Sequence, residues 1–295
     1  MGTLAEMLST PLGVIEWFVY LLAAVMFVIG LHLMNSPKTA RKGNMVSAIG
    51  MVFAVAMAFI VLFAGEASNG FKHGVAVIVL IVGIVIGAVA GVVSAKKVKM
   101  TDMPQLVSVF NTVGGGAAAL VALNDILTSA ETPSIVVLIT AGLGIMIGSV
   151  TFSGSLIAAG KLQGIKWVKK LSLPGKGFWN ILFVVLTIVS FVMLCVQPNQ
   201  RLLWSILTTV FALCYGLVFV IPIGGADMPV VISVLNACTG TAVAMSGLAI
   251  NNIALIVAGA LVGAAGVTLS IAMSKAMNRP LLSVLAGGFG GSNSA

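Results

Sequence analysis

The chain has 295 residues, of which 60% are hydrophobic and only 7% are charged, against about 25% charged residues in a typical soluble domain. So few charges cannot cover the surface of a soluble protein of this length, which excludes soluble enzymes, disordered tails and disulfide-rich secreted modules. The net charge of +8 comes from basic residues in short runs between apolar segments, a pattern that sets membrane topology and does not indicate nucleic-acid binding.

Nine segments are long and apolar enough to cross a membrane, because about 30 Å of hydrocarbon requires about 20 helical residues. In chain order they are 14–34, 45–64, 74–95, 103–123, 134–160, 179–197, 202–222, 228–249 and 253–274. All nine prolines lie between these segments or at their ends, where they do not interrupt hydrogen bonds that lipid cannot replace. The sequence therefore predicts an all-α integral membrane protein, a bundle of nine transmembrane helices.

The basic residues predict how these helices are oriented. Thirteen of the 15 Lys and Arg residues lie on the side reached after odd-numbered segments, and only Lys72 and Arg201 lie on the other side. Basic loops stay in the cytoplasm. We therefore expect the N-terminus outside and the C-terminus in the cytoplasm.

Glycines recur at four-residue spacing inside three of the segments. This spacing lets helix backbones approach closely, so it predicts helix packing before any other role. The glycines concerned are Gly83, Gly87 and Gly91, then Gly144 and Gly148, then Gly259 and Gly263.

A repeat joins the fourth and eighth segments. Residues 102–111 and 227–236 share the pattern Asp-Met-Pro-x-x-x-Ser-Val-x-Asn. An Asp before a helix with Pro in its first turn is a favourable helix start. Both copies begin even-numbered segments, which indicates a parallel internal repeat of segments 4–5 and 8–9, an arrangement found in transporters.

The repeat places polar side chains at matched depth. Ser108 and Asn111 are three residues apart, as are Ser233 and Asn236, so each pair shares one helix face. Each Asn is eight residues past the Met of the motif, about 12 Å into the helix and near the bilayer midplane. Thr112 extends this face of the fourth segment. These residues could act only to hold the helices together, a role called structural glue here, with about 0.6–2 kcal/mol per hydrogen bond between helices. Alternatively, they could form a shared polar path, and their repetition favours the path.

Chemistry-bearing residues are scarce elsewhere. No Asp, Glu, Lys, Arg or His lies in the middle of a predicted span, although a proton relay usually requires a titratable group. Either the chain moves no protons alone, or water and a partner subunit complete the path. We find no metal-binding cluster, paired carboxylates or activated nucleophile, so we predict no catalytic or metal site. The glycines at 287–291 do not form a dinucleotide fingerprint and are typical of a linker.

Several short sequence segments resemble the β subunit of proton-translocating NAD(P)+ transhydrogenase, and they occur in the order found in that family. They cover nearly the whole chain and comprise residues 36–44, 101–105, 114–116, 152–155, 160–164, 225–229, 275–280 and 286–290.

The resemblance implies a nine-helix proton-translocating membrane domain at 1–285. Residues 286–295 would begin the linker to an NADP(H)-binding domain absent from this chain. Such enzymes couple proton translocation to hydride transfer between NAD(H) and NADP(H) on soluble domains. The chain itself would bind no cofactor, whereas the complete enzyme uses NAD and NADP.

The resemblance also implies partners and a location. The partners would be alpha subunits, which carry membrane helices and an NAD(H)-binding domain, together with the NADP(H)-binding domain and the lipid bilayer. The whole complex would form a dimer in the bacterial inner (plasma) membrane and bind no nucleic acid.

Individual residues match family positions. Asn236 matches a proton-path asparagine, and Ser155 and Gly266 match positions that line or pack that region. Asp227 and Arg279 match charges that communicate with the NADP(H) domain, and Asp102 is the counterpart of Asp227 in the repeat. The proton-path set is Asn111, Asn236, Ser155, Thr112, Ser108, Ser233 and Gly266.

One departure from the family pattern concerns Asn111. Some members have His at this position, so in the branch with Asn the titratable group would come from helices of the alpha subunit. This expectation agrees with the scarcity of ionisable residues inside the predicted spans.

Two other functions remain open from the residues alone. Repeats and midplane amides also occur in self-contained secondary transporters for small solutes, and a purely structural scaffold is a third possibility. A transporter should carry a polar cavity and usually a broken helix. No predicted span is interrupted by proline, which weakens the transporter hypothesis.

Overall fold

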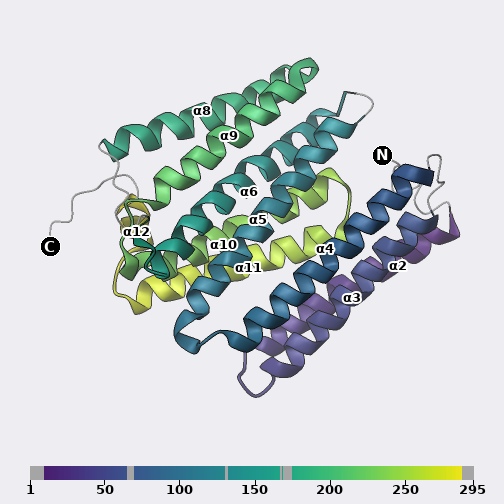
Figure 1. Cartoon of the computed structure of the whole chain (residues 1–295), viewed down its shortest axis with the longest axis horizontal. Coiled ribbons are helices and arrows are strands. Elements are labelled where there is room, and N and C mark those ends of the chain that lie inside the picture. The colour runs from purple at the N-terminus through teal and green to yellow at the C-terminus, as the bar shows by residue number, and fades with distance from the viewer. Residues whose placement is uncertain (1–9, 65–69, 130–131, 167, 169–174, 288–295) are drawn as a thin grey trace. The chain divides into compact units, whose positions relative to one another are not determined.

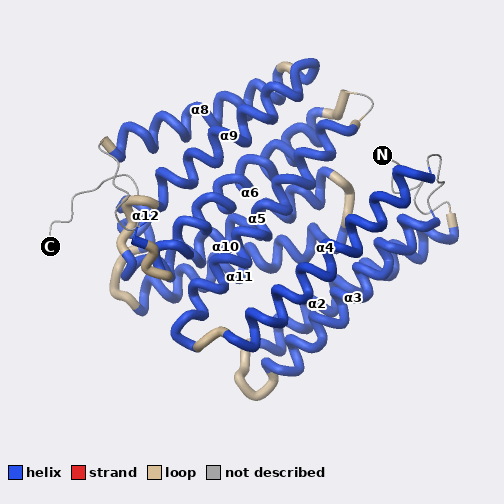
Figure 2. The backbone as a smooth tube through the Cα atoms, in the orientation of Figure 1, coloured by secondary structure: helices blue, strands red, loops and turns tan. Residues whose placement is uncertain are grey.

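The computed structural model describes residues 10–64, 70–129, 132–166, 168 and 175–287. The chain divides into two compact units, Met1–Met103 and Pro104–Ala295. The described residues contain helices and no strands (Figures 1 and 2). Nine of the helices in this part of the chain are long and apolar enough to cross a membrane, which confirms the predicted all-α membrane fold.

The first unit contains three of the long helices, α2 (Pro11–Met34), α3 (Ala40–Ala64) and α4 (Gly70–Lys97), followed by the short η1 (Met100–Asp102). α2 begins where Thr10 accepts a hydrogen bond from the Gly13 amide, with Pro11 as its first residue, a favourable helix start. α2 and α3 pack against each other. The buried residues of α3 are Gly43, Gly50 and Met57, and their seven-residue spacing keeps them on one face.

α4 differs from its neighbours because none of its described side chains is buried. Within its unit, a Cβ added at Gly83, Gly87 or Gly91 meets no atom within 4 Å. No described helix of the same unit packs on this glycine row, so its packing role stays a prediction. The packing role is confirmed for the other two rows, whose members lie against atoms of neighbouring helices.

The second unit is a bundle in which α6 and α10 lie innermost. α6 packs against α8, α9 and α10, and α10 also packs against α11. The short helices η2 (Pro198–Gln200) and η3 (Gly225–Asp227) precede α9 and α10. The remaining elements are α5 (Met103–Thr128), α6 (Ile135–Leu162), α8 (Lys176–Val196), α9 (Arg201–Val220), α10 (Met228–Ala249), α11 (Ile253–Ala276) and α12 (Leu281–Gly287).

The nine long helices correspond one to one with the predicted spans, with differences at their ends. α3 begins five residues before its predicted span, and α5 ends five residues after its own. Helices continue past the hydrocarbon into the polar interface, and hydropathy does not mark where they end there. The short α12 was not predicted. It runs through Gly287, past the predicted domain boundary at 285, and residues 288–295 of the predicted linker lie outside the described residues.

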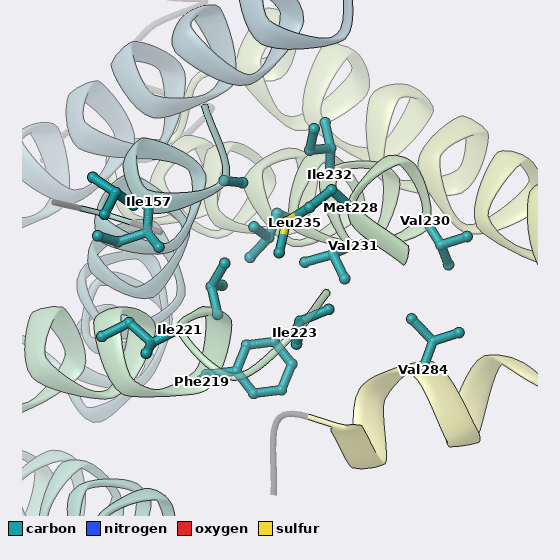
Figure 3. Close-up of a cluster of buried hydrophobic side chains, with 13 residues drawn as sticks. Ile157, Phe219, Ile221, Ile223, Met228, Val230, Val231, Ile232, Leu235 and Val284 are labelled. Atoms are coloured by element: carbon teal, nitrogen blue, oxygen red, sulfur yellow. The ribbon is translucent and has the colours of Figure 1, made fainter. Parts of the chain in front are cut away.

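A buried apolar cluster joins α6, α9, α10 and α12 at one end of this bundle (Figure 3). Ile223, in the connection between α9 and α10, packs with Val231 of α10, and Val284 of α12 points toward Val230. In a membrane, such clusters stabilise the fold through van der Waals packing. Lipid tails are as apolar as these side chains, so moving a side chain from lipid into the protein interior gives no hydrophobic free energy. The cluster fixes the connection that leads into η3.

Candidate functional site

α5 and α6 share a buried group of polar side chains. The Asn111 amide nitrogen donates to the Ser155 hydroxyl at 2.8 Å, and the Ser108 hydroxyl donates to the Ser155 carbonyl at 2.8 Å. The Thr112 hydroxyl donates to the Ser108 carbonyl of its own helix at 3.0 Å. Asn111 is only 6% exposed. The structure therefore brings together four of the residues predicted for the proton path.

Two glycines that face each other, Gly115 of α5 and Gly148 of α6, explain how these polar side chains can meet. A Cβ built on Gly148 of α6 would lie 2.7 Å from the Gly115 carbonyl of α5, too close for any side chain. The two backbones therefore approach as closely as small residues permit. At this spacing even short Ser and Asn side chains bridge the helices.

The second copy of the repeat makes a related contact between α10 and α11. The Ser233 hydroxyl donates to the Gly266 carbonyl at 3.1 Å, and Ser270 donates to the same carbonyl at 2.7 Å. Asn236 is half-buried, and its amide has no hydrogen-bond partner among the described residues. The two repeated serines thus both donate to a backbone carbonyl of the following helix, whereas the two repeated asparagines have different surroundings.

Two buried polar atoms in this region lack a hydrogen-bond partner in the described part of the chain. They are the Asn111 carbonyl oxygen and the hydroxyl oxygen of Thr239. The Thr239 methyl group would lie 3.4 Å from a Cβ on Gly114, so Thr239 of α10 faces α5 one turn from Asn111. An unsatisfied buried polar atom costs about 1–3 kcal/mol, and such atoms in a native fold often mark function.

Sequence reasoning missed Thr239 and one further contact. Thr239 follows Asn236 by three residues, so the spacing that linked Ser233 to Asn236 could have found it. The Ser246 hydroxyl of α10 donates to the Ala118 carbonyl of α5 at 3.0 Å. Hydrogen bonds and close contacts therefore connect α5 with α6, α5 with α10, and α10 with α11.

An ion pair joins the end of α11 to the start of α10. The Arg279 Nη1 donates to both carboxylate oxygens of Asp227 at 2.7 Å. Asn278, at a positive φ of 53°, follows the C-cap of α11, and the Ser274 hydroxyl donates to the Arg279 carbonyl. Asp227 is 14% exposed and Arg279 is 44% exposed, so the pair is partly accessible from outside the bundle.

The third predicted coupling residue, Asp102, is the last residue of η1 and belongs to the first unit. It is exposed and accepts a hydrogen bond from the Thr101 hydroxyl at 3.4 Å. The structure therefore brings two of the three predicted coupling residues together.

The opposite end of α5 borders a hollow of about 420 Å³. Asp125 lies there in the last helical turn, and its Oδ2 atom is buried without a hydrogen-bond partner among the described residues. The hollow presents a carboxylate and no cation, so its lining does not fit the phosphates of NAD or NADP. Its lining residues are Leu120, Val121, Asn124, Asp125, Thr128 and Ile250.

Comparison with known proteins gives one consistent result. The chain matches the family model described as NAD(P) transhydrogenase beta subunit over residues 16–295. Two curated relatives from Rhodospirillum rubrum, both named NAD(P) transhydrogenase subunit beta, are each 39% identical to it over 278 residues, which is 92% of the chain. The chain spans 57% of the length of these relatives.

Proposed function

The chain belongs to the NAD(P) transhydrogenase beta subunit family, and on this premise we propose that it carries protons across the membrane for a complete transhydrogenase. Proton movement drives hydride transfer between NAD(H) and NADP(H), which soluble nucleotide-binding domains carry out. Family membership favours this function over a self-contained solute transporter.

The observation that carries the proposal is the polar contact between α5, α6 and α10. Asn111 is held by Ser155 through its nitrogen, while its carbonyl oxygen and the Thr239 hydroxyl have no partner in the described part of the chain. Structural glue would be expected to use its buried polar atoms fully, since each unmade hydrogen bond destabilises the fold. Atoms left available at this depth fit a role in passing protons.

The chemistry of these residues sets what they can do. An amide offers both a donor and an acceptor but does not change its charge near neutral pH. Asn111, Asn236 and Thr239 would therefore orient water or a partner's side chain, and the group that takes up the proton would come from membrane helices of an alpha subunit. Ser108, Ser233 and Gly266 would hold the helices at the required spacing.

The Asp227–Arg279 pair would transmit the proton-driven change to the NADP(H)-binding domain. The pair is partly exposed and joins the two helices that carry Asn236 and Gly266. We propose that the Asp227–Arg279 pair and Asp102 lie on the cytoplasmic side of the membrane. The complete enzyme would be a dimer of the whole complex in the bacterial inner membrane.

The test uses the assembled enzyme in proteoliposomes, with hydride exchange and internal pH recorded together. Asn111→Leu should lower proton-coupled turnover by about tenfold, which corresponds to about 1.4 kcal/mol. Thr209→Val is the matched control, because the Thr209 hydroxyl bonds only its own helix, at the Ser205 carbonyl. Equal turnover in the two variants would mean that Asn111 is structural glue.

A further inference from the structure

Lys161, near the C-terminal end of α6, contacts the connection between α9 and α10. Its ammonium nitrogen donates to the carbonyls of Val220 at 3.3 Å and Ile223 at 2.8 Å, and also to the carbonyl of Ile221. The contacts join residues about 60 positions apart in the chain. No sequence pattern discussed above assigned this lysine a role.

The contact suits the chemistry of both sides. An ammonium group has three N–H donors and no acceptor, and the last carbonyls of a helix lack intrahelical partners. The negative end of the helix dipole also favours a cation there. Val220, Ile221 and Ile223 are all nearly inaccessible to solvent, so these carbonyls have little access to water, and the charge would be costly to remove.

The connection held in this way leads directly to the ion pair. Ile223 is followed by Gly224 and then by η3, whose last residue is Asp227. The position of the Asp227 carboxylate therefore depends on how the residues after α9 are fixed. Asp227 in turn binds Arg279 at the end of α11.

The same helix also carries the partner of Asn111. Ser155 precedes Lys161 by six residues, about 9 Å along α6 at 1.5 Å per residue. A helix is stiff over this distance, so a displacement of α6 at Ser155 also moves the Lys161 contact. α6 thus connects the buried polar group to the segment that positions Asp227.

We propose that Lys161 is a positioning residue that couples the buried polar group at Ser155 to the Asp227–Arg279 pair. The proposal rests on the proposed function, because it concerns how proton movement reaches the nucleotide-binding side. A purely structural cap would affect stability and turnover together. A coupling contact predicts a selective loss of the response to a proton gradient.

The test compares Lys161→Met and Lys161→Arg with Lys166→Met in the assembled enzyme. Lys166 is exposed, lies five residues further along and serves as the matched control. The first measurement is hydrogen–deuterium exchange of the Ile221 and Ile223 amides, which bond the Leu217 and Val220 carbonyls. In Lys161→Met this exchange should be about tenfold faster, equivalent to about 1.4 kcal/mol of lost local stability.

The second measurement is hydride exchange with and without an imposed proton gradient. Lys161→Met should lose most of the gradient response while retaining basal exchange, Lys161→Arg should keep most of the response because the charge remains, and Lys166→Met should match the wild type. Equal loss of basal and gradient-driven exchange would overturn the coupling role, as would a gradient response in Lys161→Met equal to that of the wild type.

The amide-exchange measurement separates this proposal from the proposed function. Unchanged amide exchange in Lys161→Met would show that the contact does not hold the segment, whatever the enzyme does. If the wild-type enzyme showed no response to a proton gradient, both the proposed function and the coupling role would be refuted. This holds even if amide exchange of Ile221 and Ile223 becomes faster in Lys161→Met as expected.

Discussion

Replacing Gly266 with alanine should force α11 away from α10 at the level of Asn236. The added Cβ would lie 2.7 Å from the Ala237 nitrogen and 2.8 Å from its Cα, against 3.4 Å or more for an ordinary contact. The helices must therefore separate by about 0.7 Å, since close-packed backbone cannot yield in another way. The Ser233–Gly266 hydrogen bond, already 3.1 Å long, would stretch beyond the usual limit.

The expected cost follows from these two changes. Overpacking typically costs about 1–3 kcal/mol, and a hydrogen bond between membrane helices contributes about 0.6 kcal/mol. Gly266→Ala should therefore lower the free energy of unfolding by about 2–4 kcal/mol, before the gain of about 1 kcal/mol from replacing glycine in a helix.

Gly114→Ala is the matched control for this prediction. A Cβ at Gly114 meets only the Thr239 methyl group, at 3.4 Å, so this variant receives the same gain in helix propensity without the clash. Unfolding in mixed micelles with increasing sodium dodecyl sulfate measures both free energies. If the two variants unfold at the same detergent fraction, then α10 and α11 do not pack as closely as described.

Further predictions concern the site and the topology. Asn236→Leu should slow proton-coupled turnover and leave thermal stability nearly unchanged, because its amide has no hydrogen-bond partner among the described residues; a large drop in melting temperature would contradict this. Asn111→His should be tolerated or should shift the pH profile of turnover, since it introduces a titratable group, and complete inactivation at every pH would count against the proton path. A double-mutant cycle on Asp227→Ala and Arg279→Ala should give a coupling free energy of about 0.2–1 kcal/mol for stability, because the arginine is 44% exposed; a value several times larger would mean that the pair is buried in the protein. A reporter fused after Ala295 should be active only in the cytoplasm and one in the α5–α6 connection only outside, and the reverse pattern in both would refute the orientation.

The long helices were predictable because a membrane span needs only about 20 apolar residues, a property of the local sequence. The shared face of Ser108 and Asn111 was also predictable, since it depends on helical periodicity alone. The seven-residue helix α12 was not, because a segment this short carries too little periodicity to be recognised.

The difference between Asn111 and Asn236 could not be predicted from their matching motifs. Each motif determines only which face of its own helix the Asn occupies, whereas the hydrogen-bond partner of that Asn comes from the following helix. For Asn111 this partner is the Ser155 hydroxyl of α6. The Lys161 contact was equally hidden, because its acceptors are backbone carbonyls, which every residue has. Only the fold brings these carbonyls to the lysine.

The unburied surface of α4 has a consequence for how the chain enters the membrane during synthesis. α4 has the highest mean hydropathy of the nine spans, and none of its described side chains is buried. A helix with its backbone hydrogen bonds satisfied internally is stable in lipid alone, so α4 can leave the translocon before any later helix exists. α10 is the opposite case, with the lowest mean hydropathy and the largest buried share. Its stable insertion therefore depends on α6, already made, and on α11, which is made after it.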